Sequence, residues 1–162
     1  MATFQINEAF LVEIKDLIKK RNISRIKGKL GHAHYADLGE IIEAISLNEA
    51  TYLVKVLGSD KTAEALAEVN PDIREGILEK LSAKEIAKEV LELDTDDAAD
   101  IILELPEERQ EKVMSQITDD EHVSDIRDLL KYEENTAGAL MAKELVKSLM
   151  NKCIRLVFST HI

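Results

Sequence analysis

The segment Asp94-Thr-Asp-Asp-Ala-Ala-Asp100-Ile-Ile-Leu-Glu-Leu105 combines a helix start, an apolar helix face and a group of carboxylates. Asp94 is a favoured N-cap residue, and the carboxylates that follow it meet the free backbone amides and the positive dipole end of a first turn. At about 100° per residue, the apolar side chains share one stripe: Ala98, Ile101, Ile102 and Leu105. The segment therefore predicts a short amphipathic helix.

Two acidic residues of this segment lie on the face opposite the apolar stripe. Asp96 and Asp100 are four residues apart and stack in a helix, and no lysine or arginine lies within the helix to offset them. Like charges at this spacing cost roughly a few tenths of a kcal/mol. Two interpretations stay open, namely acidic capping with solubility and a hard-cation site. Mg²⁺ keeps most of its waters and needs only one or two protein carboxylates, so the pair would suffice.

A second acidic pair lies on the helix expected over residues 61–69. Glu64 and Glu68 stack on one face, opposite the buried stripe formed by Thr62, Ala65, Leu66 and Val69. Lys61 precedes Glu64 by three residues and compensates part of the charge. From the residues alone, a solvated face is favoured over a metal site here.

Cap-type residues divide the chain at intervals of 11 to 13 residues: Ser46, Ser59, Asn70, Ser82, Asp94, Pro106 and Thr118. Each interval predicts one short helix. Three further helices are predicted before them, over residues 4–20, 22–30 and 36–45. Pairing the helices gives a repeat of about 24 residues, because apolar residues recur at that offset. Helices below about 12 residues are marginal alone, so they must stack on neighbours. The predicted fold is all-α, an α-solenoid of short helical hairpins, in preference to a four-helix bundle.

Composition agrees with one helical domain. The chain has 162 residues, 4% aromatic residues and a single cysteine, Cys153, which excludes an intrachain disulfide. No stretch has the apolar length of a signal or membrane span, which indicates a cytosolic chain. No nucleophile–base pattern or phosphate-binding glycine loop occurs, so an enzyme is not expected, and neither a catalytic nor a cofactor-binding residue is assigned.

Charge divides the chain into unequal parts. Residues 1–35 carry seven Lys/Arg against three Asp/Glu, whereas residues 36–150 carry twelve against twenty-nine. The acidic segment 36–150 repels phosphate backbones, which excludes nucleic acid as a partner and favours cations or basic surfaces. The basic N-terminal segment could touch a membrane surface, although a solvated face is the simpler interpretation.

Two stretches resemble a known family. They are residues 92–109, which contain Asp-Thr-Asp-Asp-Ala-Ala-Asp100, and Tyr132-Glu-Glu-Asn-Thr-Ala-Gly-Ala-Leu-Met141. Together with residues 34–45 they resemble the cytosolic N-terminal domain of the MgtE magnesium transporter and channel family, over roughly residues 34–147. The likeness fails beyond Lys147, and Ala139 stands where the family usually has a second glycine.

The resemblance implies a right-handed superhelix at residues 1–131, a connector toward CBS domains at 132–150 and an atypical tail at 151–162. It implies that Mg²⁺ fills the gap between the acidic surfaces of this domain and of the CBS domains of a homodimeric transporter, on the cytoplasmic side of the cell membrane. The family's ligands fall on Glu64 and Asp96, with Asp100 beside them. A chain that lacks the CBS and membrane domains would not transport by itself. The alternative is a metal-independent interaction module, similar to the helical repeats of the flagellar motor switch protein FliG or a generic solenoid.

Overall fold

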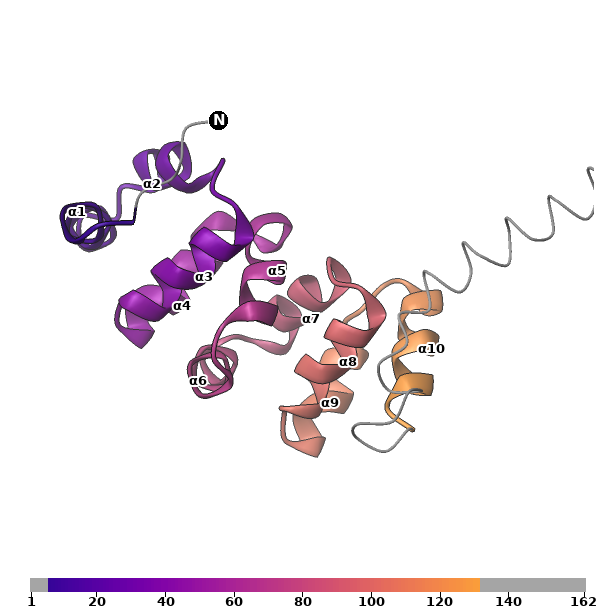
Figure 1. Ribbon diagram of the computed structural model, residues 1–162. Helices are drawn as coiled ribbons and strands as arrows, with labels where there is room; N and C mark the ends of the chain where they lie inside the picture. The colour runs from indigo at the N-terminus through magenta and orange to yellow at the C-terminus, as the bar shows by residue number, and fades with distance from the viewer. Residues whose placement is uncertain (1–5, 132–162) are drawn as a thin grey trace, which may run out of the picture.

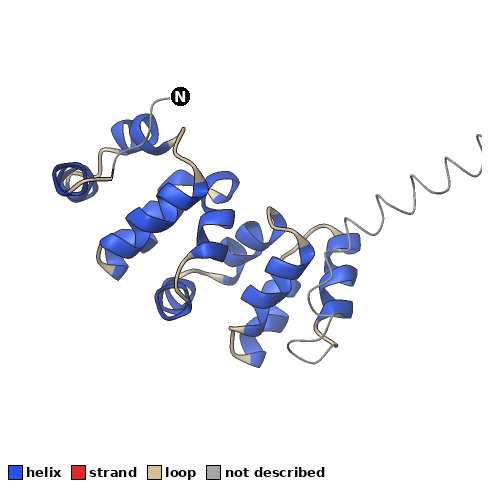
Figure 2. Ribbon diagram, viewed as in Figure 1, coloured by secondary structure: helices blue, strands red, loops and turns tan. Residues whose placement is uncertain are grey.

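Short α-helices follow one another along the chain with turns of a few residues between them. The computed structural model describes residues 6–131, and this part contains ten helices and no strand (Figure 2). The helices are α1 (Glu8–Lys19), α2 (Ile23–Leu30), α3 (Tyr35–Ala44), α4 (Leu47–Leu57), α5 (Ser59–Glu68), α6 (Pro71–Lys80), α7 (Ala83–Leu91), α8 (Thr95–Leu103), α9 (Glu107–Met114) and α10 (Asp120–Leu129).

Polar caps determine where most of these helices begin. Ser46 and Ser82 each form a complete capping box. The backbone N–H of Ser82 donates to Glu85 Oε2 at 2.7 Å, and the N–H of Glu85 donates to Ser82 Oγ at 3.3 Å. Asn70 caps α6, whose first residue is Pro71. Each cap satisfies backbone donors that the first turn leaves without partners, which confirms the predicted spacing of about 12 residues.

Two of the predicted cap residues, Ser59 and Thr118, are wrong by one residue. Ser59 is the first helical residue of α5, and Gly58 is the N-cap, with a positive φ of 92° that favours glycine. Thr118 is not the cap of α10; the side chain of Asp119 accepts from the N–H groups of residues 121 and 122. At α5 the positive φ of the residue before Ser59 makes glycine the N-cap, whereas at α10 the adjacent Asp119 caps in place of Thr118.

The helices stack in a row and form a solenoid (Figure 1). Helices two apart in the chain pack together, as α3 does on α5, α5 on α7, α7 on α9 and α8 on α10. Eight apolar residues of the 24-residue repeat lie in the core and are at most 6% exposed: Leu66, Val69, Ile77, Leu81, Val90, Leu93, Ile101 and Leu105. The predicted solenoid of stacked hairpins is confirmed, because each helix buries its stripe on its neighbours.

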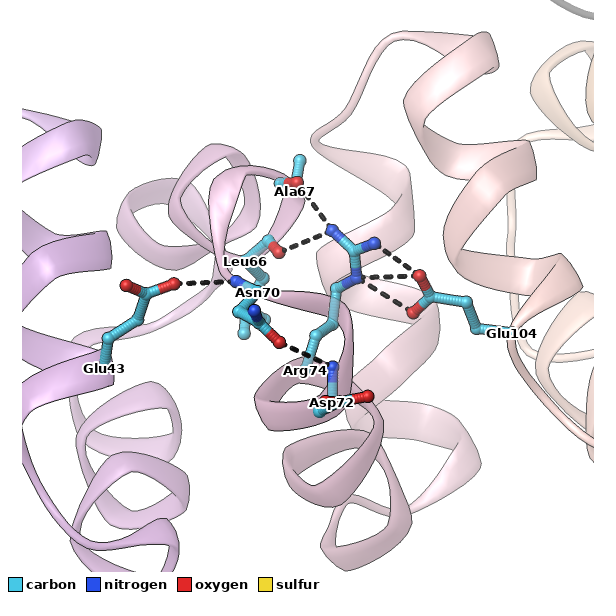
Figure 3. A network of polar contacts seen from close by, with 7 residues as sticks. All are labelled: Glu43, Leu66, Ala67, Asn70, Asp72, Arg74 and Glu104. Atoms are coloured by element: carbon cyan, nitrogen blue, oxygen red, sulfur yellow. Dashed lines mark hydrogen bonds and ion pairs between the residues drawn. The ribbon is translucent and has the colours of Figure 1, made fainter. Parts of the chain in front are cut away.

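A buried arginine links successive repeats (Figure 3). Arg74 of α6 is 9% exposed, and its guanidinium binds the carboxylate of Glu104, the C-cap of α8, with Nε 2.8 Å from Oε2. The same guanidinium donates to the carbonyls of Leu66 and Ala67 at the end of α5. One side chain therefore satisfies a carboxylate and two carbonyls from different helices.

The N-terminal helices differ slightly from the prediction. A helix was expected from Phe4, but α1 begins at Glu8 because the side chain of Asn7 accepts from the N–H of Phe10. The start of α2 after Asn22 is confirmed. The predicted connector at 132–150 and the atypical tail at 151–162 lie outside the described residues. Within residues 6–131, no helix combines the length and hydrophobicity required to cross a bilayer.

Candidate functional site

An acidic groove lies between α5 and the turn that joins α7 to α8. Its volume is about 340 Å³, and the residues that line it are Tyr35, Glu64, Ala67, Glu68, Glu92, Leu93, Asp94 and Asp97. A second groove of about 390 Å³ shares Tyr35, Glu64 and Glu92 with the first and adds Asp60, Lys61 and His34, among others. We call this continuous surface, defined by residues 60, 64, 68, 92, 94 and 97, the acidic groove.

The fold brings the two acidic helices to one place. On α5, Glu64 and Glu68 are exposed, while Thr62 and Leu66 on the opposite face are completely buried, as the pattern predicts. Because α5 packs on α7, and α7 leads directly into α8, the outer face of α5 meets the first turn of α8. The predicted N-cap Asp94 occupies its position but makes no side-chain capping bond, and its side chain lines the groove.

The three residues predicted as metal ligands occupy different positions relative to the groove. Glu64 lines it, whereas Asp96 and Asp100 are not among the residues that do. Asp100 is exposed as predicted, but Asp96 is half-buried, so the pair is not a uniformly solvated stack. Both lie close to Asp97, which does line the groove. Spacing alone did not single out Asp97, because its role depends on which helix packs beside it.

The charges of the two acidic helices act on one carboxyl group. Partial burial raises the pKa of Asp97, and the neighbouring charges of Asp96, Asp100, Asp94 and Glu68 raise it further. Since Glu68 belongs to α5 and the others to α8 and its cap, the negative potentials of both elements overlap there. A cation placed in this region would gain from all of them.

Among residues 6–131, positive side chains do not neutralise the acidic groove. Across residues 6–131, no lysine, arginine or histidine nitrogen lies within 4.0 Å of a carboxylate oxygen of Glu64, Glu68, Asp96 or Asp97. Lys61 lines the second groove but forms no ion pair with Glu64, so the compensation that their spacing suggests is not made. The carboxylates therefore keep an attraction for external cations.

Glu89 is a titratable residue of this region that sequence reasoning missed. Its side chain lies between α5 and α7 and is 5% exposed, and its two carboxyl oxygens are 3.1 and 2.9 Å from Thr62 Oγ1. Burial raises the pKa of Glu89 to about 7, and the charges of Glu92, Asp60 and Glu85 add to the rise. Its position beside buried Ile86 and Val90 was the available sequence signal.

The donor set limits what kind of ion the groove can bind. In the described part of the chain, no group of three or more His, Cys, Asp or Glu side chains is arranged to hold a metal ion. Transition metals require such sets. A hydrated divalent ion does not, because carboxylates can accept hydrogen bonds from its bound waters. The exposed, uncompensated carboxylates fit a hydrated Mg²⁺ in this respect.

An all-α solenoid with an acidic groove across two of its helices defines a helical-repeat domain with a cation-attracting surface. A family model described as the MgtE intracellular N domain matches residues 33–135. The match covers well over half of the chain, and the chain belongs to this family. It is the family of a transporter's intracellular domain and not of an enzyme, and it confirms the resemblance found in the sequence.

A solved structure has the same fold. The crystal structure of the soluble part of a magnesium transporter matches with a TM-score of 0.72 and 21% sequence identity. The match covers 83% of this chain and 53% of the other, so this chain spans about half the length of that one. None of the curated proteins compared with this chain matches it. Helices α1 and α2 precede the residues that the family model matches.

Proposed function

We propose that this chain is the cytosolic regulatory domain of an MgtE-like magnesium transporter, where it senses Mg²⁺ on the cytoplasmic side of the cell membrane. Its partners would be the CBS domains and the membrane domain of the same transporter, which the family forms as a homodimer. In this proposal, the acidic surface closes on the CBS domains when Mg²⁺ lies between them, and this closed arrangement keeps the pore shut.

One observation carries the proposal. Acidic groups from α5 and α8 converge, and no basic side chain of residues 6–131 forms an ion pair with Glu64 or Asp96. Two acidic surfaces repel each other unless positive charge lies between them. A cation that binds only where the surfaces meet stabilises the closed arrangement in proportion to its occupancy. A fall in the Mg²⁺ concentration would therefore release this domain from the CBS domains.

We propose Glu64, Asp96 and Asp100 as the residues that hold the ion, mostly through its waters. Glu64 contributes from the groove, and the two aspartates contribute from the first turns of α8. The chemistry of a hydrated ion explains why residues that do not touch one another can share it. Without the CBS surface, the site is half complete, so binding by this domain alone is expected to be weak.

The test is a Mg²⁺ titration of this domain mixed with the CBS domains, read by limited proteolysis. Rising Mg²⁺ should protect both partners. Glu64→Ala and Asp96→Ala should each move the protection midpoint to higher Mg²⁺ by at least about tenfold, the usual scale for residues that hold a metal through outer-shell contacts. Asp100→Ala should act in the same direction.

Glu79→Ala is the matched control, because Glu79 is an exposed carboxylate on α6 away from the groove. It should leave the midpoint unchanged. Protection that is the same in the Glu64→Ala and Asp96→Ala variants as in the wild type would refute these ligands. Protection that persists in EDTA would instead identify a metal-independent interaction module.

A further inference from the structure

The first two helices differ in charge from the rest of the solenoid. Residues 1–35 hold seven Lys/Arg and three Asp/Glu, and all ten of these residues lie between positions 8 and 29. Helices α1 and α2 occupy one end of the row of helices, where they pack on each other and on α4 (Figure 1). They also precede the stretch that the family model matches, so the function proposed above makes no use of them.

Within residues 6–131, most of the basic side chains at this end form no ion pair with a carboxylate. Two ion pairs form, Lys20 with Asp16 at 2.7 Å and Lys29 with Glu13 at 2.9 Å. Five exposed basic residues have no carboxylate oxygen within 4.0 Å among residues 6–131: Lys15, Lys19, Arg21, Arg25 and Lys27. The end of the solenoid therefore presents positive charge that internal pairing does not cancel.

Exposed apolar side chains lie next to these lysines. Val12 is 62% exposed and Ile23 is 48% exposed. On α1, Val12 shares one helical stripe with Lys15 and Lys19, at spacings of three and seven residues. On α2, Ile23 lies one turn from Lys27. A bulky apolar side chain beside lysine stems is the combination that suits a lipid–water interface, where the stems extend along apolar groups and the ammonium groups reach headgroups.

We propose that the α1–α2 end binds the anionic surface of a phospholipid bilayer. A bilayer supplies negative headgroups for the lysines and adjacent hydrocarbon for Val12 and Ile23, whereas an acidic polypeptide supplies only the charge. The acidic groove is repelled by the same surface, so contact through the basic end is the favourable orientation. The proposal rests on the proposed function only in that a transporter domain is held beside a membrane.

The test is sedimentation of the 162-residue chain with phosphatidylcholine vesicles that contain or lack phosphatidylglycerol, in EDTA. We expect binding to the anionic vesicles only, and its loss at about 1 M salt, where the Debye length falls to about 3 Å. The double variant Lys19→Gln/Lys27→Gln should reduce partitioning by roughly 25-fold, since each basic residue at the surface contributes roughly a factor of five.

The double variant Lys84→Gln/Lys88→Gln is the control, because it removes the same charge from exposed positions on α7. It should bind as the wild type does. Equal losses in the two double variants, equal binding to both vesicle types, or no binding would each overturn the proposal. Retention on immobilised polyglutamate without binding to vesicles would also overturn it and would indicate an acidic polypeptide partner. Because the vesicle assay is done in EDTA and its variants leave the groove residues unchanged, its outcome does not depend on whether the proposed Mg²⁺ site is correct.

Discussion

Glu104 and Glu64 are carboxylates of neighbouring repeats with opposite electrostatic surroundings. The carboxylate of Glu104 binds the buried guanidinium of Arg74, which also satisfies two carbonyls at the end of α5 (Figure 3). Glu64 lines the acidic groove, and no lysine, arginine or histidine nitrogen of residues 6–131 lies within 4.0 Å of its carboxylate oxygens. The fold neutralises the carboxylate that joins repeats and leaves uncompensated the one that faces a groove. Stability and cation attraction therefore come from different carboxylates.

The largest effect is expected from removing the cation of the neutralised pair. Arg74→Ala leaves the Glu104 carboxylate and two carbonyls of α5 without their donor in a site that is mostly shielded from water. We expect a loss of about 3 kcal/mol in the free energy of unfolding, the scale for breaking a buried ion pair on one side. Urea denaturation followed by circular dichroism at the helix band measures it.

Lys112→Ala is the control for Arg74→Ala. Lys112 also pairs with a glutamate, Glu108, but both side chains are largely exposed, so we expect almost no change in the free energy of unfolding. A loss of similar size in both variants would show that the Arg74 network adds nothing beyond a surface ion pair.

Glu89 is a buried carboxyl group that forms no ion pair with any basic residue in the part of the chain from 6 to 131, so its surroundings are intermediate between those of Glu104 and Glu64. The pKa of Glu89 is raised to about 7 in the folded chain from 4.5, chiefly by burial, so the folded state holds the proton more tightly than the unfolded state does. The contribution of Glu89 to stability is therefore greatest below pH 4.5, decreases as the pH rises to about 7, and stays low above that. This is the opposite of the dependence expected for a carboxylate paired with arginine.

Glu89→Gln should remove this pH dependence. We expect the variant to exceed the wild type in stability by about 2 kcal/mol at pH 8, where the buried carboxylate is charged, and to differ little at pH 4.5, where the carboxyl and the amide are both neutral. Urea denaturation at several pH values measures the difference between variant and wild type. Glu79→Gln, at an exposed position, should give a flat difference. A flat difference for Glu89→Gln as well would mean that Glu89 is ionised without penalty.

Local features of the fold could be predicted from the sequence, because their causes are local. The capping box of Ser82 and Glu85 and the Asn70-Pro71 start depend on residues within one turn. The 24-residue recurrence of apolar residues was enough to predict stacking. The starts at Ser59 and Thr118 were wrong because the choice between adjacent residues depends on the backbone conformation, as the φ of Gly58 shows.

The candidate site was only partly predictable, because its members come together through packing. Glu64 was identified from its spacing to Glu68, but the contact of their helix with the first turn of α8 requires the solenoid. Asp97 was missed for that reason. Glu89 was missed because its partner, Thr62, lies 27 residues away in the sequence, and nothing in the spacing of α7 indicates which helix covers it.

The smallest expected effect is that of Glu64→Gln, and it should be opposite in sign to that of Glu104→Gln. Glu64 has acidic residues one turn away on both sides, Asp60 and Glu68, and only Lys61 to offset them. Glu64→Gln should therefore raise the free energy of unfolding by roughly 0.5 kcal/mol and the melting temperature by about 2 °C in EDTA at low salt, because it relieves like-charge repulsion. Glu104→Gln should lower both the free energy of unfolding and the melting temperature, since it weakens the bond to Arg74.

Thermal denaturation followed by circular dichroism measures both variants. At about 1 M salt the gain in stability of Glu64→Gln should disappear, whereas the loss of Glu104→Gln should persist. If Glu64→Gln instead destabilised the chain, its carboxylate would have a structural role like that of Glu104, and the separation between stabilising and cation-attracting carboxylates would be wrong.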